Sequence, residues 1–265
     1  MGDVAKPRPR IEPSSEEPVT AFEGKSVLVT GGSRGIGKGI ALRFAELGAA
    51  RVAVSYLRND RAAEETGKEL EQLGAHPLLL RGNLGDPEKA AALVEQAGQL
   101  DVLVSNAATG VIRPALEIEE KHWDWTMNAN ARALLTLTRH AAPSMPAGSS
   151  IVAISSLGAQ RVLDDYVVVG VSKAALEALV RYLAVELAPR GIRVNAVSAG
   201  LVETGALEYF ANREVMLEYY KRRTPAGRLV GPSDVADVVC FLASPEADMI
   251  RGQTLVVDGG YSVLA

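Results

Sequence analysis

The sequence has little of what would build a disulfide framework, a histidine-rich metal site or a membrane span. It contains one cysteine, Cys240, and three histidines in 265 residues. One cysteine excludes a disulfide framework and indicates a reducing compartment. No apolar run approaches the roughly 18 to 20 residues that a membrane span needs. We therefore expect a soluble, cytoplasmic protein with no metal centre and no membrane contact.

The chain also lacks the excess of basic residues that nucleic-acid-binding proteins carry. Its 28 lysines and arginines face 32 aspartates and glutamates, a net charge of -4, which argues against a nucleic-acid partner. Residues 1–20 lack the apolar core of a signal peptide and carry four prolines among charged side chains. We expect residues 1–20 to form a flexible tail, and residues 21–265 to form one domain.

What the sequence does contain is a regular alternation of short apolar segments with longer helical patterns. The expected strands are residues 26–30, 51–56, 77–81, 101–106, 150–155, 192–198 and 254–257. The expected helices lie near residues 36–47, 60–73, 86–98, 119–142, 167–189 and 232–243. This alternation predicts an α/β fold: a single doubly wound Rossmann domain, with a seven-stranded parallel sheet and helices on both faces.

A glycine-rich loop follows the first expected strand and opens a helix. It reads Gly31-Gly32-Ser33-Arg34-Gly35-Ile36-Gly37. Glycine permits a tight turn and a close approach to a pyrophosphate, and the N–H groups and dipole of a helix start favour negative charge. The spacing differs from the G-x-G-x-x-G dinucleotide fingerprint. The loop predicts a phosphate site, and a glycine-rich turn without a ligand is the alternative.

The loop resembles the T-G-x-x-x-G-I-G turn of the short-chain dehydrogenases/reductases, and the resemblance extends over residues 22–265. The resemblance implies a homotetramer whose subunits pack near Asp258-Gly259-Gly260. For Asn106, a strand-end cap is an equally good interpretation. The cofactor-binding residues that the resemblance implies are Gly31, Ser33, Arg34, Gly35, Ile36, Gly37, Arg58, Asn83, Leu84, Asn106, Ala107, Lys173, Ala199 and Gly200.

The residues after the second expected strand indicate which nicotinamide cofactor is used. The strand ends without the carboxylate that would accept a hydrogen bond from the ribose 2′-hydroxyl of NAD. Arg58, together with Arg34, can instead bind a 2′-phosphate. NADPH is therefore the expected cofactor. Asp60, two residues after Arg58, argues in the other direction.

The expected catalytic tyrosine does not stand in its usual place. The family usually has tyrosine four residues before the lysine, where this chain has Val169. Tyr166 lies seven residues before Lys173, and this Tyr-x6-Lys spacing resembles the enoyl-acyl carrier protein reductase branch. Within that branch, residues 122–128, 224–228 and 247–254 are most similar to the NADPH-dependent enoyl-acyl carrier protein reductases III.

The resemblance implies NADPH-dependent reduction of the trans-2 double bond of an enoyl-acyl carrier protein, in fatty-acid or related acyl-chain biosynthesis. Tyr166 would hydrogen-bond the enolate oxygen, and Lys173 would hold the nicotinamide ribose and polarise Tyr166. Ser156 and Asn130 take the places of the family's serine and asparagine, and they could equally be satisfied polar groups beside the helices. A short-chain carbonyl (3-ketoacyl) reductase and a non-catalytic NADP-binding protein are the alternatives.

Two features near the end of the chain suggest how an acyl substrate would be handled. By resemblance, residues 201–224 form a substrate lid, and their methionines and aromatics suit an acyl chain, although such residues also serve plain packing. Lys221, Arg222 and Arg223 form a basic run in an otherwise acidic chain. This run is a candidate docking site for the acidic acyl carrier protein, and a solvated helix end is the alternative.

Overall fold

The computed structural model describes residues 21–202 and 213–264, and these form one seven-stranded parallel sheet. Each of the seven expected strands is present. The predicted tail, residues 1–20, and residues 203–212 of the predicted lid lie outside the described residues. The strands are β1 (Ser26–Val29), β2 (Arg51–Tyr56), β3 (His76–Arg81), β4 (Val102–Ser105), β5 (Ser150–Ser156), β6 (Arg193–Ala199) and β7 (Thr254–Val257).

The sheet changes winding direction beside its first strand. The spatial order is β3-β2-β1-β4-β5-β6-β7, so β1 pairs with both β2 and β4. Val27, for example, lies opposite Val52 on one side and Val102 on the other. In open α/β sheets, ligands bind outside the carboxyl ends of the strands at such a switch point. The glycine loop follows β1 and therefore lies there.

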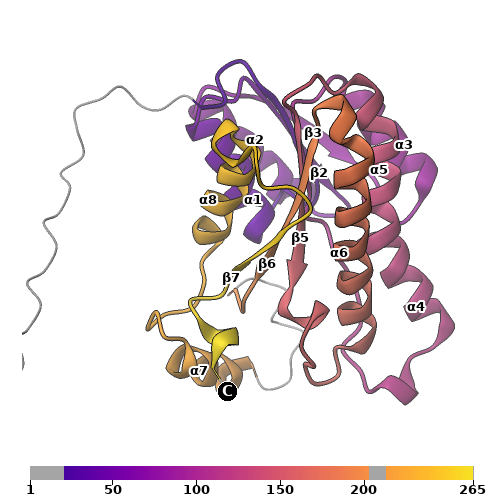
Figure 1. The fold of residues 1–265 in the computed structure, drawn as a ribbon, viewed down its shortest axis with the longest axis vertical. Helices are drawn as coiled ribbons and strands as arrows, with labels where there is room; N and C mark the ends of the chain where they lie inside the picture. Colours follow the sequence, from indigo (N-terminus) through magenta and orange to yellow (C-terminus); the bar gives the residue numbers. More distant parts are fainter. Residues whose placement is uncertain (1–20, 203–212, 265) are drawn as a thin grey trace, which may run out of the picture.

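Helices cover both faces of the sheet, as the alternation predicted (Figure 1). Helices α1, α2 and α8 lie on one side, and α3, α5 and α6 lie on the other. Both faces of the strands are apolar because both are buried. The helices are α1 (Gly35–Glu46), α2 (Asp60–Gln72), α3 (Pro87–Ala97), α4 (Glu120–Met127), α5 (Ala133–Ala141), α6 (Val167–Leu187), α7 (Arg213–Arg223) and α8 (Pro232–Ala243).

The single helix expected over residues 119–142 is interrupted. A π-helical turn, Asn128–Arg132, separates α4 from α5. Asn130 lies in this turn, and its buried side chain bonds to Thr109 and Ser172, in two other segments of the chain. The wider turn accommodates an extra residue, which local helix propensity does not reveal. The expected helical segment is therefore present from Glu120 to Ala141, with a π-helical turn inside it that the sequence did not predict.

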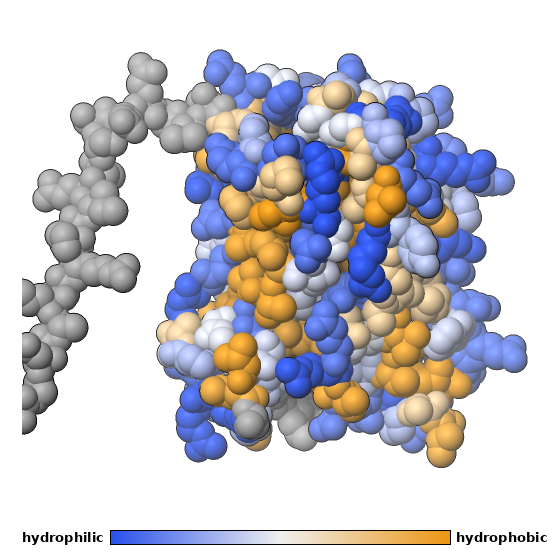
Figure 2. Space-filling view, viewed as in Figure 1, coloured by the Kyte–Doolittle hydropathy of each residue, from blue (hydrophilic) through white to orange (hydrophobic). Residues whose placement is uncertain are grey.

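The edge of the sheet at β7 carries exposed apolar side chains. They include Val185 on α6, Phe241 on α8 and Val256 on β7. Figure 2 shows apolar surface on this face, interrupted by charged side chains. Grouped apolar surface is typical of protein–protein contacts.

No helix among the described residues combines the length and the apolar character needed to cross a bilayer.

Candidate functional site

The glycine loop has the geometry of an anion site. Gly31 and Gly35 have positive φ angles of 63° and 54°, which favour glycine. A Cβ atom on Gly37 would overlap the carbonyl of Gly31 and the amide of Asn106. Arg34 is the N-cap of α1, and no side chain caps this helix start in the described part of the chain. The first N–H groups of α1 are thus left for a bound phosphate.

Residues at the end of β4 hold this loop in place through hydrogen bonds. The Thr30 hydroxyl oxygen accepts hydrogen bonds from the backbone N–H groups of Asn106 and Ala107, at 2.9 and 3.1 Å. The Asn106 amide donates to the carbonyls of Thr30 and Gly31, at 2.8 and 3.2 Å. Asn106 therefore fixes the shape of the loop, which is the strand-end role that the sequence left open. Ala107 packs against Gly31.

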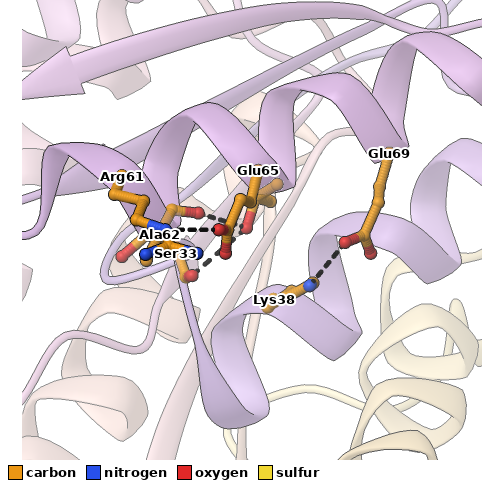
Figure 3. Close-up of polar contacts among 7 residues, drawn as sticks. Ser33, Lys38, Arg61, Ala62, Glu65 and Glu69 are labelled. Carbon is orange, nitrogen blue, oxygen red and sulfur yellow. Dashed lines mark hydrogen bonds and ion pairs between the residues drawn. The ribbon is translucent and has the colours of Figure 1, made fainter.

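Helix α2 supports the loop from the other side. The buried Thr66 hydroxyl donates to the Ser33 carbonyl at 3.1 Å. Lys38 of α1 pairs with Glu69 of α2 at 2.8 Å, next to this contact (Figure 3). Ser33 and Arg34 are consequently held at the end of the loop nearest α2.

The predicted 2′-phosphate and adenine residues lie at the same edge of the sheet. Arg34 and Arg58 are both exposed, Arg34 at the start of α1 and Arg58 in the loop after β2. Asn83 and Leu84 follow β3; the Asn83 side-chain oxygen accepts from Gly85 N at 3.0 Å, and Leu84 is buried. The Gly82 N–H donates to the Tyr56 carbonyl at 2.9 Å and keeps the ends of β2 and β3 together.

The end of β6 carries Ala199 and Gly200. Ala199 pairs with Ser156 of β5 on one side and with Val257 of β7 on the other. A Cβ atom on Gly200 would lie 2.8 Å from the Cβ of Asp258, so a larger residue does not fit without a shift. The backbone of Gly200 thus closes tightly against the segment after β7.

Tyr166 stands immediately before α6, as its N-cap residue. Its ring lies against Gly158, where a Cβ atom would come within 2.6 Å of two ring carbons. Burial raises the pKa of the Tyr166 phenol, and a side-chain hydrogen bond with Ser156 opposes this shift. Tyr166 therefore presents a protonated phenol beside Ser156 at neutral pH.

Lys173 lies nearly two helical turns farther along α6 and is buried. Its Nζ donates a hydrogen bond of 2.7 Å to the carbonyl of Ile154, two residues before Ser156 on β5. Desolvation lowers the pKa of Lys173 to about 8. The structure thus brings Tyr166, Ser156 and Lys173 together at the carboxyl end of β5.

Asn130 reaches the same helix from the π-helical turn. Its side-chain oxygen accepts from Thr109 N at 2.8 Å, and its Nδ2 donates to Thr109 O and to the Ser172 hydroxyl, both at 2.9 Å. Both N–H bonds of the amide are occupied within the protein. In this structure Asn130 ties the loop after β4 to the turn of α6 that holds Lys173.

Val169 occupies the position four residues before Lys173, and its side chain is 7% exposed. It packs against Gly110, where any Cβ atom would overlap the Val169 side chain. The Ser172 hydroxyl also donates to the Val169 carbonyl. This position belongs to the packed interior of the loop after β4.

Sequence reasoning missed a buried carboxylate one turn beyond Lys173. Glu177 is 5% exposed, and its side-chain oxygens accept from the Ser155 hydroxyl at 2.7 Å and from Gln160 Nε2 at 3.0 Å. These bonds hold both ends of the segment that carries Ser156. The signal in the sequence was a single glutamate on the same helix face as Lys173.

Comparison with known proteins agrees with this geometry. Residues 31–262 match the family model described as enoyl-(acyl carrier protein) reductase. The 1-cyclohexenylcarbonyl-CoA reductase of Streptomyces collinus is 38% identical, covering 95% of this chain and 92% of that protein. The L-rhamnose 1-dehydrogenase (NAD(P)(+)) of Sphingomonas sp. is 36% identical, covering 91% of this chain and 98% of that protein.

A solved structure shares the whole fold. A short-chain dehydrogenase from Burkholderia cenocepacia J2315, in complex with NADP, superposes with a TM-score of 0.84 at 34% identity. The match covers 91% of this chain and 99% of that one. With the glycine loop, the parallel sheet and the Tyr166–Lys173 pair in place, the chain belongs to the short-chain dehydrogenase/reductase family and is an oxidoreductase.

Proposed function

We propose that this protein is an NADPH-dependent enoyl thioester reductase, which reduces the trans-2 double bond of an enoyl-acyl carrier protein. The observation that carries the proposal is the position of the phenol. Tyr166 stands just before α6 beside Ser156, while Val169 is packed away from the site. The match to the enoyl-(acyl carrier protein) reductase model and the relative that acts on a coenzyme A thioester support this reaction class.

The residues at the carboxyl edge of β1 and β2 fit a phosphorylated dinucleotide. The uncapped start of α1 suits the pyrophosphate, and Arg34 and Arg58 suit the 2′-phosphate. The solved relative from Burkholderia cenocepacia binds NADP. When bound, NADPH supplies the hydride that this reaction adds to the β-carbon of the substrate.

Tyr166 acts at the thioester oxygen. When hydride adds to the β-carbon, negative charge develops on the thioester oxygen through the conjugated double bonds. A hydrogen bond from the phenol stabilises this charge. The raised pKa of Tyr166 keeps its proton in place for this bond. The earlier position of the tyrosine, at the start of α6, moves the donor toward this more distant oxygen. A proton then reaches the α-carbon to complete the saturated product.

Lys173 contributes a buried positive charge beside the end of β5. Its ammonium is fixed by the Ile154 carbonyl in a buried setting, where a charge acts more strongly than in water. It opposes the negative charge that develops on the substrate, and by family resemblance it also holds the nicotinamide ribose. Glu177 and Asn130 keep the flanking backbone in place.

A substrate comparison tests the proposal directly. The purified protein is expected to oxidise NADPH with crotonyl-coenzyme A and with crotonyl-acyl carrier protein, and to leave acetoacetyl-coenzyme A largely unreduced. Absorbance at the nicotinamide band reports turnover. A higher rate with acetoacetyl-coenzyme A than with crotonyl-coenzyme A would contradict the proposal and would support the carbonyl reductase alternative. The L-rhamnose dehydrogenase relative favours that alternative, because it acts on a different class of bond.

Cofactor preference is the first mutational prediction. Arg58→Ala removes an exposed guanidinium after β2, and a charge-assisted bond to phosphate contributes roughly 1.5 to 3 kcal/mol. Affinity for NADPH is therefore expected to fall about tenfold or more, while affinity for NADH stays nearly constant. Fluorescence titration with both cofactors measures the ratio. Equal losses for NADPH and NADH would reject this role of Arg58.

We further propose that the acyl carrier protein docks at the carboxyl end of α7. Lys221 and Arg222 are exposed there. Arg223 lies over the Tyr219 ring and, with Arg161, lines a cavity beside Leu157, the residue after Ser156. Cations beside this cavity suit an acidic carrier.

Charge reversal at Arg222 tests this docking surface. Arg222→Glu is expected to raise KM for crotonyl-acyl carrier protein about threefold to tenfold, because rim charges act mainly on encounter. KM for crotonyl-coenzyme A should change little. Arg139→Glu, an exposed change on α5, is the control. Equal effects of Arg222→Glu on both substrates would exclude docking at this helix end.

A further inference from the structure

In the sequence, Asp60 is the carboxylate that argues against NADPH as the cofactor. In the structure, Asp60 forms an ion pair with Arg81. Asp60 is the first residue of α2, after the N-cap Asn59. Arg81, the last residue of β3, donates from Nη1 to both carboxylate oxygens of Asp60 at 3.4 Å. Arg81 lies directly opposite Tyr56 in the sheet, so the pair spans the ends of β2 and β3.

The location of this pair matters because Arg58 stands two residues before Asp60, in the exposed loop that leads into α2. An unpaired carboxylate there would repel the 2′-phosphate that Arg58 and Arg34 are proposed to bind. We propose that Arg81 is a specificity-determining positioning residue, which selects NADPH by neutralising Asp60 and holding it on the β3 side of the loop. This inference rests on the proposed use of NADPH.

Two neighbouring cations on α1 and α2 pair with other carboxylates, whereas Arg81 pairs with Asp60. On α2, Arg61 pairs with Glu65 at 2.8 Å, and Lys38 of α1 pairs with Glu69 at 2.8 Å; Figure 3 shows both pairs. Tyr56 also faces Asp60: partial burial raises the pKa of its phenol, and a hydrogen bond to the carboxylate raises it further. A neutral phenol orients Asp60 and leaves its charge in place, whereas Arg81 cancels it.

The side chains of Arg81 and Asp60 are 61% and 53% exposed. An exposed pair is partly screened by water and salt, so we expect a moderate effect on affinity. Arg81→Gln should raise the Kd for NADPH about fivefold at low salt and leave the Kd for NADH unchanged. Asp60→Asn should lower the Kd for NADPH or leave it constant. Both constants come from titration of the intact protein with each cofactor.

The double variant separates an indirect role from a direct one. If Arg81 acts through Asp60, then Arg81→Gln combined with Asp60→Asn restores the NADPH affinity to near the original value. If Arg81 binds the phosphate itself, the double variant stays as weak as Arg81→Gln, and the proposal is overturned. Arg61→Gln is the matched control, since it breaks a similar exposed pair on the same helix, and it should leave the ratio of the two Kd values constant.

The wild-type titration distinguishes this inference from the function on which it rests. If the unmodified protein prefers NADH or binds neither cofactor, the proposed cofactor is wrong and the inference fails with it. If the unmodified protein prefers NADPH and Arg81→Gln leaves the ratio unchanged, only the role of Arg81 is refuted. A fivefold loss that is specific to NADPH and reversed by Asp60→Asn establishes it.

Discussion

Replacing Tyr166 with phenylalanine is expected to lower turnover of crotonyl thioester by about ten- to a thousandfold. The substitution removes only the hydroxyl, and the ring keeps its place against Gly158. The thioester oxygen then develops negative charge without a donor beside it. Because the loss concerns the transition state, kcat should fall and KM should stay close to its original value. The Kd for NADPH is expected to stay unchanged.

Tyr182→Phe is the control for this change. Tyr182 lies on the same helix, α6, and is 71% exposed, so loss of its hydroxyl should leave turnover unchanged. Steady-state kinetics of both variants with crotonyl and acetoacetyl thioesters make the comparison. Full enoyl activity in Tyr166→Phe would show that the phenol of Tyr166 is not the hydrogen-bond donor.

Replacing Lys173 with methionine is expected to abolish most activity while making the folded protein more stable. Turnover should fall about a hundredfold or more, since a preorganised charge is lost. The pKa of Lys173 is lowered from 10.5 to about 8, so burying the charge costs about 3 kcal/mol. The bond to Ile154 offsets part of this cost. A net gain of about 1 kcal/mol at pH 7 follows for the methionine variant.

The pH dependence of this gain has a defined sign. Below about pH 8 the native ammonium is charged and its burial cost is present in full. As the pH rises toward 10.5, the native state releases its proton before the unfolded state does, so the cost disappears. Denaturant unfolding at pH 7 and pH 9.5 should therefore show a smaller advantage of Lys173→Met at the higher pH. Lys89→Met, on the surface of α3, should show no such trend, and a constant advantage of Lys173→Met would argue against a buried charge.

The sequence was enough to predict the sheet, because the buried strands are short apolar runs separated by amphipathic helices. The seven predicted strands all appear. Tyr166 lies beside Ser156 and Lys173 bonds to the Ile154 carbonyl, so both lie near the end of β5. The glycine loop was equally readable, since positive φ angles and close backbone contacts leave glycine as the fitting residue at Gly31 and Gly37.

The features that sequence reasoning missed all depend on partners far away in the chain. The π-helical turn contains Asn130, whose side chain forms hydrogen bonds with Thr109 and Ser172, 21 and 42 residues away. Arg81 meets Asp60 across 21 residues, and the pair becomes visible only once the ends of β2 and β3 are adjacent. Periodicity reports which face of an element is buried, and it carries no information about which polar group lies opposite.

The packing of Val169 on Gly110 also restricts how this enzyme could change its chemistry. A tyrosine at position 169 would have to enter the space next to the Gly110 backbone and the Thr126 methyl group, where a single added carbon on Gly110 already overlaps Val169. Moving the phenol by one helical turn therefore requires the loop after β4 to be rebuilt at the same time. We expect the two reaction types to be separated by several coordinated substitutions, so that neither laboratory evolution nor natural drift converts one into the other through a single codon.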